Sequence, residues 1–464
     1  MANEGFRKVQ NSSERFRKVR KGSERFRRVC HALVVCVLLG IPAMLMGQAV
    51  SDPMKGVAER YVKLVLAVGQ HDADYVDAFY GPAEWRKAAE AEKLPLSALD
   101  QQAEALEKDI AAVTAASPVP ADAPLWTLRK QYLARQVSAL RSRVSMLQGK
   151  RLTFDEESAA LYDAVAPTQT EAGFDLVLKQ LEARLPGDGS LIERYDRFKQ
   201  DFVIPTARVD RVFREAIRAC RDRTLAHIEL PPEERFAVEY VTGKSWSGYN
   251  WYQGGYKSLI QVNTDLPIYV DRALDLACHE GYPGHHVYNV LLEKHLVRDR
   301  GWIEYTVYPL FSPQSLIAEG TANYGIEVAF SPADRITFEK EVLFPLAGLD
   351  AKRVQEYYDV LTLVDRLSYA GNEAARRYID GMIDRAGAVA WLEKYAMYTK
   401  PRAEQRLKFI DQYRSYVINY NLGKDLIRDY ITRKAGKQAA SARRWAEFTA
   451  LLSSPRLPSG LKAK

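Results

Sequence analysis

The chain has 464 residues, of which 47% are hydrophobic and 27% charged, so it can bury a sizeable core and is not disordered as a whole. Its net charge of +7 lies almost entirely in residues 1–49, which contain ten Lys or Arg and three Asp or Glu. The remaining residues carry equal numbers of both signs. We therefore expect no nucleic-acid partner for the body of the protein.

Residues 1–49 have the layout of a signal peptide. A basic leader, which repeats a Phe-Arg-Lys/Arg-Val element every ten residues, ends at Arg28 and precedes an apolar run over 32–46. The run is short for a bilayer span of about 20 residues. We expect cleavage after Ala49, a secreted or periplasmic mature chain, and no stable membrane association after cleavage. The alternative is a membrane anchor formed by the uncleaved signal.

Residues 50–230 are predicted to form an N-terminal helical region. Apolar residues recur there at three- and four-residue spacing, as in the two runs Val57, Tyr61, Leu64, Val65, Val68 and Leu128, Tyr132, Leu133, Val137, Leu140. Turn-forming residues at 117–120, 186–189 and 230–232 separate the predicted helices. We place a boundary near Pro231.

Residues 231–453 form the second predicted region, which begins with strand-like sequence. Val, Tyr, Trp, Gly and Ser are frequent over 236–262, and residues 258–263 alternate as in a strand. Helical patterns follow from Val354 to about Leu452, and residues 454–464 are predicted to be a flexible tail. Cys220 and Cys278 are the cysteines of this body, and the sequence does not decide whether they pair.

A histidine cluster lies just after the strand-like stretch. His279, His285 and His286 are three of seven histidines in the chain, and Glu280 follows the first. A zinc peptidase helix usually places two His four residues apart on one face, with Glu after the first as general base. Here the spacing is six, which on a regular helix puts the rings on different faces.

The residues between the histidines offer a solution to this spacing. Gly281, Pro283 and Gly284 cannot support a regular helical ladder, so we expect a bulged or unwound turn that brings His285 beside His279. His286 regains the same face without distortion but lies about 10 Å along the axis. We prefer His285 as the ligand and keep His286 as a reserve.

A third ligand is expected in the helical sequence 316–324, where Glu319 is the candidate. Two His and one Glu leave the fourth zinc position for water. Asn323 and Glu327 could support the ligands by hydrogen bonds, or form an ordinary polar helix face. The fold class that follows is mainly α: a multi-helical, zinc-peptidase-like fold with a cleft and a small β element beside the metal-binding helix.

The segment 278–286, together with Ile317-Ala318-Glu319-Gly320, resembles the His-Glu-x-x-Pro-Gly-His signature of the bacterial domain-of-unknown-function 885 family, which is similar to gluzincin-type zinc peptidases. The resemblance extends to residues 248–252 and 262–264, and more loosely to 371–374 and 378–381. It implies zinc on His279, His285 and Glu319, with Glu280 as base. Tyr288 and Asn372 depart from the family pattern, which leaves substrate preference open.

These residues predict a secreted zinc metallopeptidase that acts on peptides or other small substrates. Glu280 would take a proton from water, and Tyr378 or Arg366 would stabilise the oxyanion. The strand 257–263 could offer an edge to an extended peptide, or could be a wall without substrate contact. The alternatives are a zinc hydrolase of esters or other amides, including cell-wall amides, and a catalytically inactive secreted binding protein.

Overall fold

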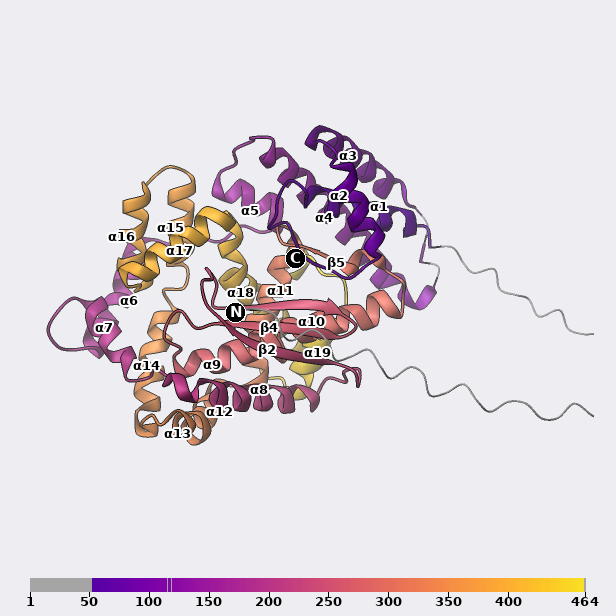
Figure 1. Cartoon of the computed structure of the whole chain (residues 1–464). Coiled ribbons are helices and arrows are strands. Elements are labelled where there is room, and N and C mark those ends of the chain that lie inside the picture. The colour runs from indigo at the N-terminus through magenta and orange to yellow at the C-terminus, as the bar shows by residue number, and fades with distance from the viewer. Residues whose placement is uncertain (1–51, 115, 118, 463–464) are drawn as a thin grey trace, which may run out of the picture. The chain divides into compact units, whose positions relative to one another are not determined.

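The computed structural model describes residues 52–114, 116–117 and 119–462. The chain is mainly α-helical, as its periodicity predicts (Figure 1). All five apolar residues of the first predicted run are buried on helix α1 (Lys55–Val68). The predicted signal peptide, residues 1–49, lies outside the described residues.

Three of the helices described before residue 230 end shortly before the three predicted breaks, and the others end where no break was predicted. After α1 they are α2 (Ala83–Glu92), α3 (Leu96–Ala112), η1 (Pro120–Asp122), α4 (Ala123–Leu147), α5 (Phe154–Tyr162), α6 (Glu171–Arg184), α7 (Leu191–Gln200), η2 (Thr206–Arg208) and α8 (Val209–Leu225). Thr153 and Ser190 form capping boxes at the starts of α5 and α7, which explains why helices begin there.

The strand-like sequence forms a three-stranded sheet of β2 (Arg235–Val241), β3 (Gly248–Gly254) and β4 (Lys257–Asn263). Its order is β2-β4-β3, with β2 parallel and β3 antiparallel to β4. The expectation that residues 257–263 offer a free edge is wrong, because β4 pairs on both sides. Strand β3 instead forms the edge that lies next to the histidine segment, since Asn250 of β3 bonds to the Glu280 carbonyl.

The second half continues with helical elements around a second, two-stranded pairing. They are α9 (Val270–Leu276), η3 (Ala277–Gly281), α10 (His285–Leu292), η4 (Glu293–Arg298) and η5 (Ile303–Thr306). Strand β5 (Val307–Pro309) then pairs antiparallel with β1 (Val76–Phe79) from the N-terminal region. This pairing joins the two predicted regions.

The remaining helices are α11 (Pro313–Ala329), α12 (Pro332–Phe338), η6 (Glu339–Leu343), α13 (Phe344–Ala347), η7 (Ala351–Arg353), α14 (Val354–Asp365), α15 (Ala370–Ile379), α16 (Arg385–Ala396), α17 (Lys400–Tyr413), η8 (Arg414–Val417), α18 (Ile418–Ala435), α19 (Ser441–Leu452) and α20 (Pro458–Leu461). Helix α11 packs closely along α18. At the crossing, a Cβ on Gly320 would lie 2.5 Å from the carbonyl carbon of Gly423, so glycine is required there.

Three further features correct or complete the sequence-based expectations. The described residues form one compact unit that continues across Pro231. The segment expected to be a flexible tail forms α20 within its described part, with Leu461 1% exposed, because its apolar residues pack on the core. Cys220 of α8 and Cys278 of η3 form a disulfide. No helix in the described part of the chain is long and apolar enough to cross a bilayer.

Candidate metal centre

A break between η3 and α10 brings the two histidines together. The π-helical segment η3 carries His279 and ends at Gly281, a cis peptide precedes Pro283, and α10 begins at His285. The amide of Gly284 donates to the carbonyl of Cys278 at 3.0 Å. A Cβ on Gly284 would lie 1.8 Å from the His279 carbonyl oxygen, so the chain folds back on itself only with glycine there. The expected distorted turn is confirmed.

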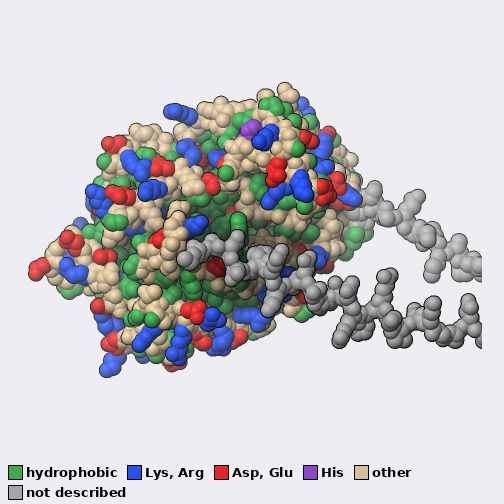
Figure 2. All heavy atoms as spheres, viewed as in Figure 1, with side chains coloured by type: hydrophobic (Ala, Val, Ile, Leu, Met, Phe, Trp, Pro, Cys, Tyr) green, Lys and Arg blue, Asp and Glu red, His purple; other side chains and the backbone are tan. Residues whose placement is uncertain are grey.

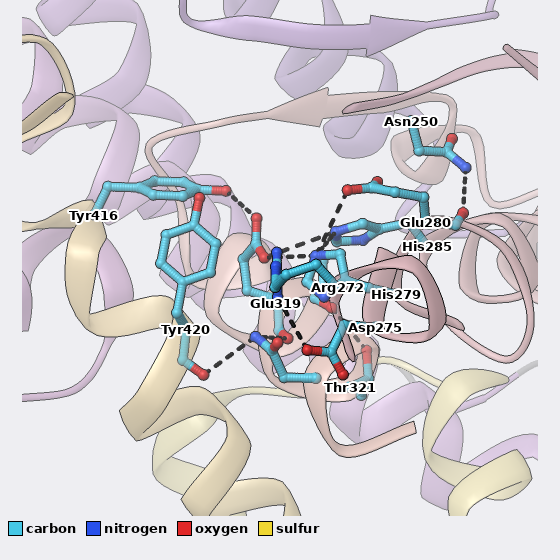
Figure 3. A network of polar contacts seen from close by, with 12 residues as sticks. Asn250, Arg272, Asp275, His279, Glu280, His285, Glu319, Thr321, Tyr416 and Tyr420 are labelled. Atoms are coloured by element: carbon cyan, nitrogen blue, oxygen red, sulfur yellow. Dashed lines mark hydrogen bonds and ion pairs between the residues drawn. The ribbon is translucent and has the colours of Figure 1, made fainter. Parts of the chain in front are cut away.

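Three side-chain atoms converge beyond this turn. The Nε2 atoms of His279 and His285 are 3.1 Å apart. Oε2 of Glu319, on α11, lies 3.3 Å from the first and 3.7 Å from the second (Figure 3). These residues are the His/His/Glu group of the described chain whose ligand atoms lie close enough to hold one metal ion. The structure thus brings together the three predicted ligands.

The donor set and its spacing fit a zinc ion. Zinc ligands at about 2.0–2.1 Å in tetrahedral geometry stand about 3.3 Å from one another, close to the three separations measured here. Oε2 of Glu319 is buried and has no hydrogen-bond partner among the described residues, a cost that a bound cation would remove. Two imidazoles and one carboxylate leave the fourth position for water.

The charges of the group also favour a cation. Burial alone would raise the pKa of Glu319, but the two histidines lower it far below its ordinary value. Burial alone would lower the pKa of His285, yet Glu319 raises it to about 9. The carboxylate is therefore ionised, and metal binding would displace a proton from the histidine pair.

Glu280 lies next to the group without joining it. Its Oε1 is 4.0 Å from Nε2 of His279, and burial raises the pKa of its carboxyl. The side chain of Asn250 donates to its backbone carbonyl at 2.7 Å, which fixes it against β3. A Cβ on Gly248 would lie 2.7 Å from Oε1, so the glycine of β3 makes room for the carboxylate. The carboxylate therefore borders the three ligand atoms without being one of them.

Two tyrosines from the C-terminal part of the chain, which the sequence analysis did not single out, border Glu319. The hydroxyl of Tyr416, in η8, donates to the other carboxylate oxygen of Glu319 at 2.8 Å. Tyr420, in α18, packs against Tyr416 with ring centroids 5.8 Å apart (Figure 3). Asn323 donates to the backbone carbonyls of Glu319 and Tyr420, so it joins α11 to α18 and does not contact a ligand side chain. Glu327 pairs with Lys424.

An acidic residue of the N-terminal region also reaches the centre. The hydroxyl of Tyr249 donates to Asp77 of β1 at 2.5 Å. Burial raises the pKa of Asp77 to about 6, and the charges of His285, Glu319 and Glu280 also act on it. No local motif marks Asp77, because β1 reaches the site only through its pairing with β5.

His286 has a different role from its neighbour. Its ring nitrogens contact Ser258 and Glu234, each at 2.9 Å, and the ring is fully buried. Tyr282 and Arg221 also donate to Glu234. Burial opposes ionisation of Glu234, but these three partners lower its pKa to about 2. These hydrogen bonds connect α10 to the sheet. Because both ring nitrogens of His286 already have hydrogen-bond partners, His286 does not serve as the reserve ligand.

The structure does not bring Tyr378 or Arg366 to the centre. The hydroxyl of the half-buried Tyr378 donates to Asp411 at 3.0 Å, and the exposed Arg366 donates to Gln180 at 2.6 Å. Asn372 of α15 does line the cavity beside the metal group. Tyr378 follows it by six residues, about 600° of helical rotation, and therefore faces away.

The centre opens into a cavity of about 1570 Å³. Strand β3 and helices α7, α9, α11, α14, α17 and α18 contribute to its lining. Figure 2 shows a hollow on the face of the molecule drawn there, with hydrophobic side chains inside it and charged side chains around it. A substrate could therefore reach His279, Glu280, His285 and Glu319 from solvent.

Comparison with known proteins gives distant structural similarities. No family model and no curated protein matches the sequence. A provisionally assigned lipoprotein of Colwellia psychrerythraea has a TM-score of 0.47 and 15% identity, covering 82% of this chain and 71% of that one. A Pyrococcus furiosus carboxypeptidase has 0.45 and 10%, covering 87% and 89%.

Metallocarboxypeptidase 1 of Trypanosoma cruzi has a TM-score of 0.33 and 12% identity, covering 86% of this chain and 90% of that one. At these scores, such similarities assign neither a metal nor an activity to this chain. The function has to be inferred from the geometry of the centre itself.

Proposed function

We propose that this chain is a zinc-dependent hydrolase of peptide bonds. The observation that carries the proposal is the convergence of three ligand atoms, from His279, His285 and Glu319, with the Glu280 carboxylate beside them and a cavity in front. A purely structural zinc site closes all four positions with protein ligands and needs no adjacent base. The arrangement here has three ligands and a neighbouring carboxylate.

Zinc bound in this group would lower the pKa of water and polarise the substrate carbonyl. Glu280 accepts one proton of the attacking water as the water oxygen adds to the carbonyl carbon. It then returns the proton to the amide nitrogen, the C–N bond breaks, and an acid and an amine are released. The raised pKa of Glu280 suits a group that must both take and give a proton.

Tyr420 is the best-placed donor for the developing oxyanion. Its hydroxyl has no hydrogen-bond partner among the described residues and its side chain lines the cavity. The hydroxyl of Tyr416 is already engaged by Glu319. Tyr420 therefore replaces Tyr378 and Arg366, which lie elsewhere, in the proposed mechanism.

Export and family membership are also proposals. The residues of 278–286 and 317–320 support membership of the domain-of-unknown-function 885 family. The leader pattern of 1–49 supports export, and a disulfide between Cys220 and Cys278 suits an oxidising compartment. Expression of the full chain followed by N-terminal sequencing tests export, and a mature chain that still begins at Met1 would contradict it.

The test of the mechanism is Glu280→Gln. The variant should bind zinc with the affinity of the wild type, since Glu280 is not a ligand, and should lose peptide hydrolysis by about 10²-fold or more. Zinc content and initial rates on a peptide mixture are measured together. A Glu280→Gln protein with wild-type turnover would overturn the role of Glu280, and one without zinc would overturn the ligand assignment.

A further inference from the structure

Two arginines that line the large cavity have no ion-pair partner among the described residues. Arg402 and Arg406 line it, and neither has a carboxylate within ion-pair distance in the part of the chain that the structure describes. Nε of Arg406 is buried and without a hydrogen bond. By contrast, Arg428, which lines the same cavity, pairs with Asp425. Arg406 is half-buried and Arg402 is exposed, so two guanidinium groups border this space without a carboxylate of the described residues to neutralise them, which points to an anionic group that comes from outside the chain.

The two arginines act from one face of α17. Their spacing of four residues places both side chains on the same side of the helix. Both act on Tyr398: burial would raise the pKa of its hydroxyl, but Arg402 and Arg406, with Arg272 behind them, lower it below its ordinary value. The positive potential is therefore concentrated around one point of the cavity wall.

A buried lysine adds to this potential. Lys199 of α7 is 9% exposed, lines the same cavity and has no ion pair among the described residues. Its ammonium lies 3.7 Å from the ring centroid of Tyr269. Burial, together with the charges of Arg402 and Arg272, lowers the pKa of Lys199 to about 8, while Asp271 opposes them. Arg272 differs from the others because it bonds to Asp275 at 3.1 Å.

Tyr420 and Tyr416 connect the cationic group to the metal ligands. The guanidinium of Arg406 is 5.8 Å from the ring centroid of Tyr420. Tyr420 packs on Tyr416, whose hydroxyl bonds to Glu319. Figure 3 shows both tyrosines on one side of Glu319, with His279 and His285 on the other. A substrate held at Arg406 would therefore extend past Tyr420 toward the metal group.

We propose that Arg402 and Arg406 form a subsite for a carboxylate of the substrate, with the C-terminal carboxylate of a peptide as the expected ligand. This inference rests on the proposed hydrolase function and specifies the end of the peptide at which cleavage occurs. The guanidinium group of arginine can bind a carboxylate through two parallel hydrogen bonds. Because only Tyr420 and Tyr416 separate Arg406 from the metal group, the bond that is cleaved would lie near the C-terminus of the peptide. The chain then acts as a carboxypeptidase that removes a short C-terminal piece.

The test uses peptides of one sequence with a free or an amidated C-terminus, and a third that is amidated but has Glu as its last side chain. Zinc-loaded wild type, Arg406→Gln, Arg402→Gln and Arg428→Gln are compared by kcat/KM and by mass spectrometry of the products. Arg428 is the matched control, because it lines the same cavity but is already paired. Thermal melting checks that every variant is folded.

We expect the wild type to shorten the free peptide from its C-terminus and to cleave the amidated one roughly 10- to 100-fold more slowly. Arg406→Gln and Arg402→Gln should remove this preference, while Arg428→Gln keeps it. Restored cleavage of the Glu-ended amide would assign the subsite to an acidic side chain. Equal, internal cleavage of all peptides would overturn the subsite and leave the hydrolase standing. No cleavage of any peptide would instead refute the proposed function.

Discussion

The crossing of α11 and α18 couples the fold to the metal group, so Gly320→Ala should damage both. An added Cβ would lie 2.5 Å from the carbonyl carbon of Gly423, whereas ordinary contact begins at 3.4 Å. The helices would have to separate by about 1 Å, and overpacking of this kind costs about 1–3 kcal/mol. Glu319 precedes Gly320, so the same shift moves a ligand oxygen away from the histidines.

Chemical unfolding and zinc titration measure the two effects. Gly56→Ala in α1 is the matched control, because a Cβ there meets nothing within 4 Å and alanine is the better helix former by about 1 kcal/mol. We expect Gly320→Ala to lose stability and at least about 10-fold in zinc affinity, while Gly56→Ala loses neither. If the two variants had the same unfolding free energy and zinc affinity, the coupling argued here would be wrong.

Three further perturbations test the surroundings of the centre. Tyr416→Phe removes the hydrogen bond to Glu319 and should weaken zinc binding by about 10- to 100-fold in calorimetric titration. An unchanged zinc affinity would contradict the role of Tyr416 in supporting the ligand Glu319. Reduction of the Cys220–Cys278 disulfide, which closes 58 residues, should lower the free energy of unfolding by about 4 kcal/mol, and an unchanged melting temperature on reduction would contradict this. Glu234 has a pKa lowered to about 2, so its contribution is present above about pH 4.5 and is lost as the pH falls toward 2. In metal-free urea unfolding, the difference between wild type and Glu234→Gln should therefore shrink in acid, and a constant difference would refute the linkage.

The parts of the fold that follow a local rule could be predicted. Apolar spacing identified α1, and turn-forming residues identified the gaps that follow α3, α6 and α8. The metal segment was also local: Pro283 and Gly284 forbid a regular helix between His279 and His285, and the π-helical break followed. Glu319 could be predicted because the residues around it, Ile317-Ala318-Glu319-Gly320, are part of the family signature that the sequence resembles.

The outer parts of the site depend on long-range packing, which the sequence pattern does not contain. Tyr416 reaches Glu319 from 97 residues away, and Asp77 reaches the centre only because β1 pairs with β5. Tyr378 was assigned from its position in a loosely matched motif, but the side of α15 that faces the cavity is set by packing, and Tyr378 lies on the other side. The sequence motif therefore predicted the metal ligands, whereas the residues that contact these ligands are positioned by tertiary packing.

The most direct test of the account is hydrolysis of an unblocked peptide library by the purified full chain, before and after removal of metal. We predict peptide cleavage that is lost on chelation and restored by about one zinc per chain, while His279→Ala and Glu319→Ala neither bind zinc nor recover activity. Cleavage that survives complete removal of metal would contradict the central claim.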